Sequence, residues 1–254
     1  VIVDAETTYI ILGITFNYDS TSTTKEKTEL ETLVNTTISN YTDDDLEDFN
    51  KPFRHSKVAR LIDETDSSIL SNITTVTLAK LITPTTTTTT AYTLNFNNAF
   101  YNPHSGHNAT AGGIIASTGF YISSATTEYF FDDDGTGNLR IYYLVAGVRT
   151  YYDEKAGTVD YTNGVIKINS ILISSVSDVD GSSSTRFRLT VIPDSNDVIP
   201  VRNQILEIDT TNTTITGGID ATATTGKGYT VATTGTTTTT SVSTSSSTAK
   251  TSSY

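Results

Sequence analysis

The chain has 254 residues, of which 36% are hydrophobic and 17% are charged, and its formal net charge at pH 7 is −12. This length is enough for one large domain or two small ones, each with a core of its own. The longest apolar runs, such as Tyr9–Leu12, are far shorter than the roughly 18 to 20 residues that cross a bilayer. We therefore expect no membrane insertion, and we expect no nucleic-acid partner because phosphate binding needs an excess of Lys and Arg.

Cys, Met and Trp are absent from the sequence, which excludes disulfides, thiolate metal sites and cysteine nucleophiles. Because the chain begins at Val1 and contains no Met, we expect it to be a processed form or a piece of a longer protein. About a fifth of the residues are Thr, a residue that favours strands and has no catalytic value in bulk. The composition is that of a scaffold.

The first third of the chain is predicted to form a small β-α-α-β unit. Thr7–Tyr18 is β-branched and aromatic, as a half-buried strand should be, and apolar spacings of three and four then predict a helix over residues 24–40. Thr42, followed by three Asp residues, predicts the start of a short helix that ends near Phe49. Ser56 is predicted to cap a further helical segment over residues 57–62, and Ile69–Ile82 is predicted to be a strand.

Pro84 and the hexathreonine run at residues 85–90 mark a joint or an exposed edge. Beyond it, recurrent turn signals predict an antiparallel β meander, and Asn163-Gly164 is the strongest signal because a type I′ turn needs positive φ at both positions. The predicted strands cover residues 128–131, 139–145, 148–152, 158–161, 165–173, 186–192 and 204–208, and the predicted turns lie at residues 132–137, 146–147, 156–157, 163–164 and 180–181.

After about Gly226 the sequence is rich in Ser and Thr and has no apolar periodicity. We expect neighbouring chains of an assembly to hold such a tail, either as an added strand or in a groove. The predicted fold class is α+β: an N-terminal β-α-α-β unit, a mainly antiparallel β region and an extended tail. The predicted domains are residues 1–84 (α+β), 85–226 (antiparallel β) and 227–254 (low-complexity tail).

Two motifs resemble metal sites, and both are interpreted as surface loops. Asp132-Asp133-Asp134-Gly135 does not match the EF-hand loop, because Phe130 stands at the first ligand position and Ile141 at the last; we expect a solvated hairpin turn. His104 and His107 form an H-x-x-H pair without a third ligand nearby. A capping or packing role is expected for His55 at a helix start.

Neither of two acidic groups is expected to form an active site. One comprises Asp63, Glu64 and Asp66, and the other comprises Asp43–Asp45 and Asp48. Acid–base catalysis needs carboxyl groups of unlike environment across a cleft, whereas these are interpreted as caps and solvated faces. The sequence has no nucleophile elbow, phosphate loop or dinucleotide glycine pattern. We expect no catalytic, cofactor-binding or metal-binding residues and no cofactor.

Two remaining patterns resemble binding or modification sites. Tyr142, Tyr143, Tyr151, Tyr152 and Tyr161 are interpreted as core and subunit-contact residues rather than a sugar platform. Glycosylation acceptor triplets begin at Asn35, Asn40, Asn72 and Asn108; in so Thr-rich a chain these arise by chance.

Several segments in order resemble one family. They are Asp48-Phe49-Asn50-Lys51-Pro52-Phe53-Arg54-His55-Ser56-Lys57, Leu61-Ile62-Asp63, and residues 68–74, 117–121, 131–140, 155–164 and 199–205. From about residue 5 to 210 these are similar to the C-terminal region of the gene-six-type baseplate wedge proteins of T-even-like contractile-tailed phages. The tail is not covered by this resemblance.

The resemblance implies a structural, non-enzymatic wedge subunit in the virion, assembled in the bacterial cytoplasm. In that family paired copies form the inner ring around the tail hub with two partner wedge proteins and rearrange when the baseplate opens. The implied partners are copies of the chain, other wedge proteins and, as further candidates, tail hub proteins. Candidate interfaces are Lys25–Asn40, Phe49–Arg60 and the tail after Gly226.

Two other classes of function remain open at this point. An extracellular Thr-rich adhesin or filament module is the alternative, and glycans on Asn72 or Asn108 would favour it. An enzyme that acts on sugars would need two carboxyl groups of different pKa facing one cleft.

Overall fold

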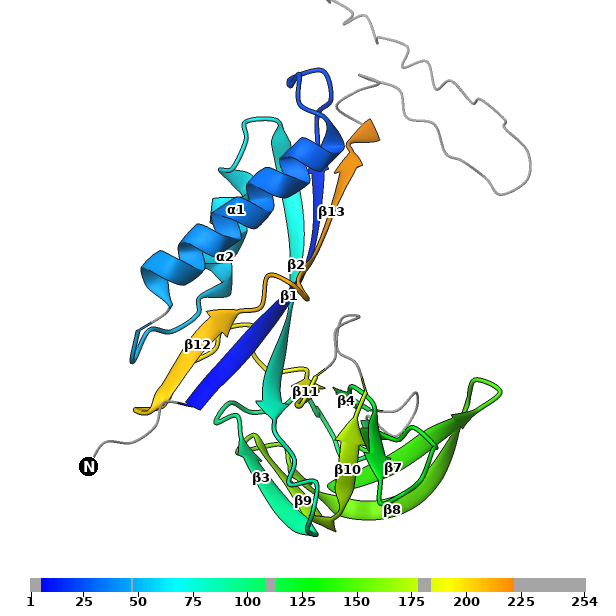
Figure 1. Cartoon of the computed structure of the whole chain (residues 1–254). Coiled ribbons are helices and arrows are strands. Elements are labelled where there is room, and N and C mark those ends of the chain that lie inside the picture. The colour runs from blue at the N-terminus through cyan, green and yellow to red at the C-terminus, as the bar shows by residue number, and fades with distance from the viewer. Residues whose placement is uncertain (1–5, 47, 108–112, 178–183, 222–254) are drawn as a thin grey trace, which may run out of the picture.

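The structure, a computed structural model, describes residues 6–46, 48–107, 113–177 and 184–221. Within these residues two helices accompany a six-stranded, a five-stranded and a two-stranded sheet. The helices lie against the long strands of the six-stranded sheet, and the five-stranded sheet lies beyond the far ends of those strands (Figure 1). The protein is therefore mostly β, with its helices confined to one part.

The six-stranded sheet is centred on β1 (Glu6–Tyr18) and its antiparallel neighbour β2 (Ile69–Ile82). Along the other edge of β1, β12 (Gln204–Ile208) pairs with its first half and β13 (Thr214–Ile219) with its second half, both in parallel. Beyond β2 lie β11 (Phe187–Val191) and β4 (Ile115–Ser117). The predicted strands at β1, β2, β11 and β12 are confirmed, whereas β4 and β13 had no prediction.

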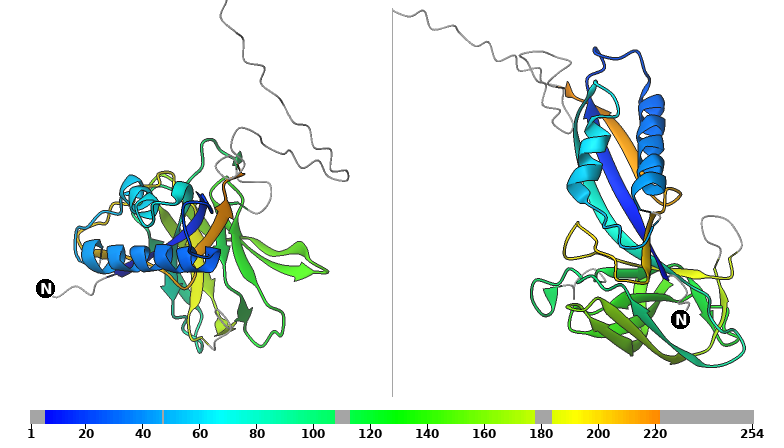
Figure 2. Two further views of the ribbon diagram at one scale, coloured as in Figure 1. Left: turned by 90° about the horizontal axis from the view of Figure 1, so that it is seen from above. Right: turned by 90° about the vertical axis from the view of Figure 1, so that its left-hand side faces the viewer.

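The helices α1 (Lys27–Asp45) and α2 (His55–Asp63) cover this sheet (Figures 1 and 2). Alternate residues of β1, among them Ile10, Leu12 and Phe16, are fully buried, as expected for a strand with one covered face. Leu30, Val34 and Ile38 of α1 belong to the same core at helical spacing. Neither described helix is long and apolar enough to span a membrane.

The two helices predicted over residues 24–40 and 42–49 are one helix as far as Asp45. The prediction of a new helix start at Thr42 is wrong, because the Thr42 hydroxyl donates to the Ile38 carbonyl one turn earlier, at 3.1 Å. Tyr41, Thr42 and Leu46 are buried, so the apolar stripe continues past the predicted break. The acidic run lies on the more exposed side of the last turn.

The helix α2 begins two residues earlier than predicted, and Ser56 does not cap it. Its cap comes from a distant residue, since the Asp197 Oδ1 atom accepts the main-chain N–H of His55 at 2.9 Å. The other carboxyl oxygen of Asp197 lies 2.8 Å from Arg54 Nη1. The His55 ring, in turn, lies with Nε2 2.8 Å from the Thr74 carbonyl oxygen, which ties α2 to β2 and agrees with the packing role expected for His55.

Replacing Asp197 with Ala is expected to lower the free energy of unfolding by about 1 kcal/mol, the usual worth of an N-terminal helix cap. Hydrogen bonds from Arg54 and the His55 N–H hold the pKa of Asp197 below its usual value, so the cap is ionised at neutral pH. Urea unfolding at pH 7 measures the loss. Ser56→Ala is the matched control, and an equal loss in that variant would contradict the assignment.

The five-stranded sheet is antiparallel throughout, in the order β3-β9-β8-β7-β6. Its strands are β3 (Thr90–Asn95), β6 (Phe130–Asp133), β7 (Asn138–Val145), β8 (Val148–Asp160) and β9 (Val165–Ile171). A separate antiparallel pair joins β5 (Phe120–Ile122) to β10 (Ile173–Val176). The antiparallel meander of β6 to β9 is confirmed, and β3, β5 and the break that separates β10 from β9 were not predicted.

Besides the turn predicted at residues 132–137, of which Asp132 and Asp133 belong to β6, two predicted turns in this sheet need correction. Ala156-Gly157 lies inside β8 rather than in a turn, so the strands predicted over 148–152 and 158–161 are one strand. The hairpin at Asn163-Gly164 is confirmed, but only Gly164 has positive φ, at 64°. The turn with positive φ at both positions is Ala146-Gly147, with φ 49° and 81°, as a type I′ hairpin requires.

Three phenylalanines join the three sheets. Phe120 of β5 stacks on Phe131 of β6 with ring centroids 4.6 Å apart, and Phe187 of β11 lies 5.9 and 6.1 Å from these two rings. All three are fully buried.

The domain division near residue 84 stays a prediction. Strands from beyond residue 84 complete the six-stranded sheet. The turn at 180–181 and the tail after Gly226 lie outside the described residues.

Candidate assembly surfaces

The first acidic group does not face a common cleft. The Asp63 carboxyl accepts a hydrogen bond from the Asn72 amide, Glu64 pairs with Arg60 one turn away, and Asp66 pairs with Lys25 at 2.6 Å. In the second group Asp45 pairs with Lys57 at 2.8 Å. No cluster of His, Asp and Glu that could hold a metal ion occurs in the described part of the chain.

His104 and His107 lie together in an exposed loop after β3. The Nδ1 atom of His107 is 3.1 Å from Nε2 of His104, and the His107 ring also contacts Tyr101 edge-on. The pair is therefore a surface contact between two rings, in the loop where the sequence predicts it.

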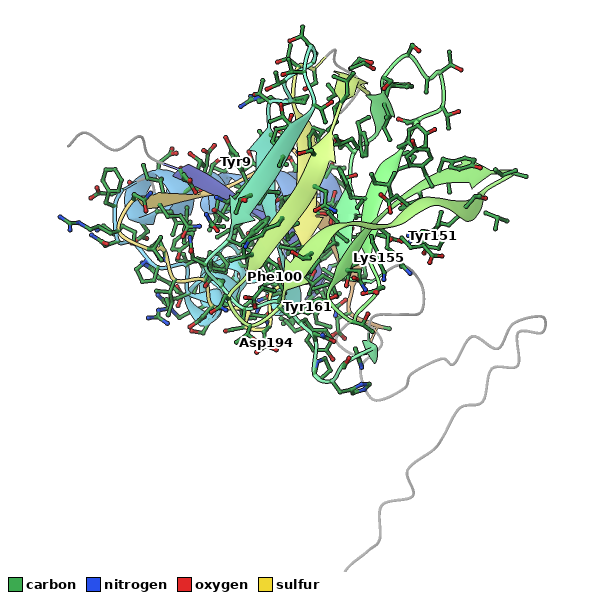
Figure 3. All side chains as sticks on the ribbon, turned by 90° about the horizontal axis from the view of Figure 1, so that it is seen from below. Tyr9, Phe100, Tyr151, Lys155, Tyr161 and Asp194 are labelled. Carbon is green, nitrogen blue, oxygen red and sulfur yellow. The ribbon has the colours of Figure 1, made fainter. Side chains whose placement is uncertain are left out.

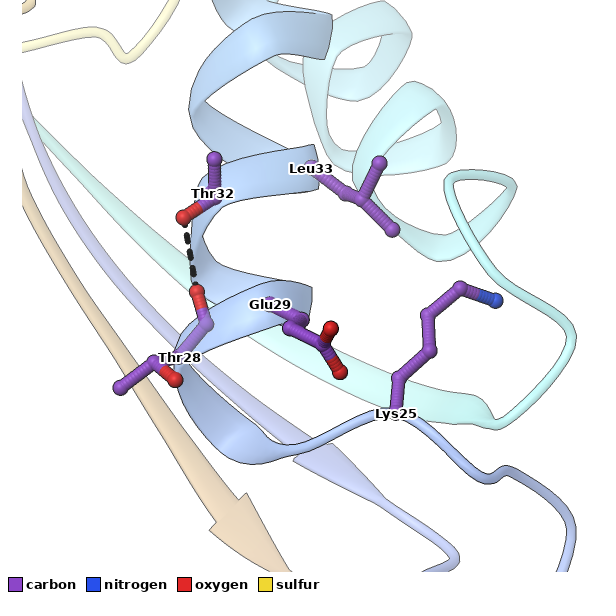
Figure 4. Close-up of a pocket in the computed structure, with 5 residues that line it drawn as sticks. All are labelled: Lys25, Thr28, Glu29, Thr32 and Leu33. Atoms are coloured by element: carbon purple, nitrogen blue, oxygen red, sulfur yellow. Dashed lines mark hydrogen bonds between the residues drawn. The ribbon is translucent and has the colours of Figure 1, made fainter.

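The candidate interface at Lys25–Asn40 coincides with the outer face of α1. The exposed residues there include Thr28, Thr32 and Thr36, and the Thr32 and Thr36 hydroxyls donate back to the helix carbonyls four residues earlier. An open hollow of about 420 Å³ beside the first turns is lined by Lys25, Thr28, Glu29, Thr32 and Leu33 (Figure 4). Thr28, Thr32 and Leu33 give the hollow hydroxyl and methyl groups, and Lys25 and Glu29 add one charge of each sign, a lining that suits a packing contact more than chemistry.

The candidate interface at Phe49–Arg60 is divided between core and surface. Phe53 and Val58 are fully buried, whereas the Phe49 side chain is 46% exposed at the start of the segment. Phe53 also pairs through its main chain with Val198. Phe49 to Lys51, Arg54 and the outer face of α2 are therefore available to a partner. The tail after Gly226, the third candidate, is outside the described residues.

The Asp132 side chain organises the junction of β6, β7 and β8. It is 1% exposed and receives Arg140 Nε at 2.8 Å, Arg149 Nη1 at 2.9 Å and the Tyr151 hydroxyl at 3.1 Å. The expectation of a solvated turn at Asp132 and Asp133 is thus wrong, because both lie in β6 and are buried. The turn itself comprises residues 134–137.

The two arginines on Asp132 also stack on tyrosine rings. The Arg140 guanidinium lies 4.3 Å from the Tyr151 ring centroid and that of Arg149 lies 4.6 Å from the Tyr142 centroid, distances at which cation–π attraction is favourable. Burial opposes the charge on Arg140, yet Asp132 raises the pKa of its guanidinium. The two arginines, which share Asp132 as their anionic partner, thus lie against tyrosine rings on one face of β7 and β8. Tyr151 is labelled in Figure 3.

Asp133 points to the opposite face from Asp132, as alternation in a strand requires. Its Oδ1 atom accepts the main-chain N–H groups of Ile114 and Ile115 at 2.7 and 2.9 Å, and its Oδ2 atom accepts the Tyr161 hydroxyl at 2.6 Å. Burial and the Asp133 carboxyl raise the pKa of the Tyr161 hydroxyl, so that it remains a donor. Asp133 thereby joins the five-stranded sheet to the segment that enters β4.

Asp134 closes the turn between β6 and β7. Its carboxyl accepts the main-chain N–H and the side chain of both Thr136 and Asn138, at 2.6 to 3.0 Å. Partial burial opposes ionisation, but these hydrogen bonds lower the pKa of Asp134 to about 2. The stability that this carboxylate contributes is therefore present above the ordinary Asp pKa of 3.8 and is lost as the pH falls toward 2.

Asp134→Asn is expected to be less stable than wild type by about 1 kcal/mol at pH 5, after allowance for solvent screening. The difference should narrow as the pH falls from 5 to 2, because the wild-type carboxylate is protonated over that interval. Urea unfolding of both proteins at several pH values measures it. A difference that stays constant with pH would show that the hydrogen bonds do not depend on the charge.

The sequence did not lead us to predict that Asp132, Asp133 and the two arginines bound to Asp132 hold neighbouring segments together. A signal for this was present in the sequence. Residues 130–133 place one Phe and one Asp on each face of a strand, but the predicted strand ended at Phe131. The tyrosines were interpreted correctly in part: Tyr142 is buried, and Tyr152 is 57% exposed.

Comparison with known proteins gives one family match. Residues 6–81 match the family model described as baseplate structural protein gp6, C-terminal domain III. These residues span β1, both helices and nearly all of β2. No curated protein matches the chain.

Proposed function

We propose that this chain, whose residues 6–81 belong to the gp6 family of baseplate structural proteins, is a wedge subunit of the inner ring around the tail hub of a contractile phage tail. A baseplate structural role and a place in the phage tail follow from the family. The ring position, the assembly in the host cytoplasm, and the contacts with copies of itself, other wedge proteins and the hub are parts of the proposal.

The observation that carries the proposal is the match over residues 6–81 together with the place of these residues in the fold. They supply the two central strands of the six-stranded sheet and both of its helices. Strands β12 and β13, from more than 120 residues later, close the open edge of β1. The matched segment is therefore part of a larger folded unit. We expect such a unit for a subunit that must keep its shape within a ring.

The described surfaces support assembly as the role of the chain. The middle turns of the outer face of α1 carry exposed Thr residues, between charged first turns and the exposed Asp43 and Asp44 of the last turn. Asp45, Glu64 and Asp66 form ion pairs within the chain. The family indicates a non-enzymatic role. We propose the rearrangement of the ring when the baseplate opens from the family resemblance alone.

Immunogold labelling of purified phage particles tests the proposal, with an antibody raised against the chain. We expect label at the baseplate end of the tail, with symmetry-related copies in each particle and none on heads. Label along the tail tube or on fibres, or absence of the chain from the particle, would contradict it.

A further inference from the structure

The hairpin of β7 and β8 extends beyond the sheet that carries it. β6 pairs with β7 only as far as Tyr142, and β9 pairs with β8 only from Gly157 onward. In the described residues, the segment 143–152 is therefore a two-stranded ribbon, and Figures 1 and 2 show its tip pointing away from the rest of the molecule. We call this segment the hairpin arm.

The hairpin arm exposes large apolar side chains. Leu144, Val145, Val148 and Tyr152 are 51%, 52%, 67% and 57% exposed. Val145 pairs with Val148, and the neighbouring pair is Leu144 with Arg149. Because successive cross-strand pairs lie on opposite faces, apolar side chains project from both faces of the arm.

The base of the hairpin arm is held in place before any partner binds. Arg149 is tied to the buried Asp132 and stacks on Tyr142, and Tyr129 contacts both Tyr143 and Tyr152 with ring centroids 5.8 and 5.0 Å apart. A two-stranded ribbon alone is marginally stable in water. An arm fixed at its base and apolar at its tip is pre-organised for insertion, because little conformational entropy remains to be lost.

We propose that the hairpin arm inserts into an apolar groove on a different baseplate protein. A standard stable interface buries roughly 800 Å² on each partner, and a ribbon of this length approaches such an area only if both of its faces are covered. A concave partner surface is therefore required. Arg149 is the single charged residue between 141 and 152 and its side chain is 37% exposed, so the groove should carry a carboxylate at its rim.

The partner is a different protein rather than a second copy of this chain. On the described surface of this chain, the hollows beside Lys25, Ser22, Arg188 and Lys167 are each lined mostly by polar or charged side chains. The chain also has a net charge of −12, which disfavours close approach of copies unless other contacts compensate. The inference rests on the proposed function, since it names the surface that meets another baseplate protein.

Site-specific crosslinking in the assembled particle tests the proposal. The chain has no Cys, so Val148→Cys provides one attachment point for a maleimide benzophenone, with Ile73→Cys as the matched control on an aliphatic strand residue that is 71% exposed. The labelled chain is assembled into particles and irradiated, and the crosslinked peptides are identified by mass spectrometry. We expect position 148 to crosslink to a different virion protein at least about fivefold more than position 73 does.

Three results would overturn the proposal: crosslinks from position 148 mainly to copies of the chain, yields no higher than those from position 73, or no crosslink in particles that contain the chain. A chain missing from the baseplate would instead refute the proposed function. As a second variant, Val148→Asp should keep the wild-type urea midpoint, because the side chain is exposed, while its incorporation into particles falls at least about tenfold. Wild-type incorporation of Val148→Asp would also overturn the proposal, and Ile73→Asp is its control.

Discussion

Asp133→Ala is expected to lower the free energy of unfolding by about 3 to 5 kcal/mol, because it leaves two buried donors and one partly buried donor without an acceptor. Two of them are the main-chain N–H groups of Ile114 and Ile115, and the third is the Tyr161 hydroxyl. Asp133 is fully buried, so water does not replace the lost acceptor without a further rearrangement. Urea unfolding at pH 7, followed by circular dichroism, measures the loss.

Tyr161→Phe separates the contribution of the hydroxyl from that of the two main-chain groups. It removes one donor together with its need for an acceptor, so a loss of only about 1 kcal/mol is expected. A similar loss in the two variants would mean that the Tyr161 contact, and not the junction with the segment before β4, accounts for the effect. A loss below about 1 kcal/mol for Asp133→Ala would contradict the assigned role altogether.

The strands of the six-stranded sheet illustrate what local sequence can predict. β1 and β2 are long and β-branched, and the predicted range 69–82 equals the observed one, because a half-buried strand needs only its own alternating pattern. The parallel pairing of β12 and β13 with β1 depends on contacts some 200 residues apart. No short-range pattern encodes that pairing, and in β13 the adjacent Gly217 and Gly218 weaken the strand signal of its Thr and Ile residues.

The errors in the helices and in the candidate site have a common physical origin. Thr and Asp satisfy main-chain donors in turns and at helix starts, and the predictions for Thr42, Ser56 and Asp132 assumed that role. In the structure neither Thr42 nor Asp132 takes that role: the Thr42 hydroxyl donates locally to the Ile38 carbonyl within α1, and Asp132 is buried against two arginines from β7 and β8. The true cap of α2, Asp197, is 142 residues from His55, and sequence alone gives no signal for it.

Gly157→Ala is expected to destabilise the protein by about 3 kcal/mol, at the upper end of the cost of overpacking. An added Cβ would lie 2.1 Å from the Lys167 carbonyl oxygen and 3.2 Å from the Ile168 Cα atom. Both atoms belong to the main chain of β9, so no side chain can rotate away and the strand itself must move. Because Gly157 lies within β8 rather than in a turn, this variant also tests the correction to the predicted topology.

Gly147→Ala is the matched control, since a Cβ there has no atom within 4 Å but the residue has a φ of 81°. It should cost about 1 kcal/mol through backbone strain alone, and it should leave the pairing of β8 with β9 intact. Amide hydrogen exchange distinguishes the two effects: Gly157→Ala should increase exchange along β9, and Gly147→Ala only at the tip of the hairpin arm. If residue 157 were in a flexible turn, Ala would be accepted there at little cost and β9 would stay protected, which would refute the continuous β8 on which the hairpin arm depends.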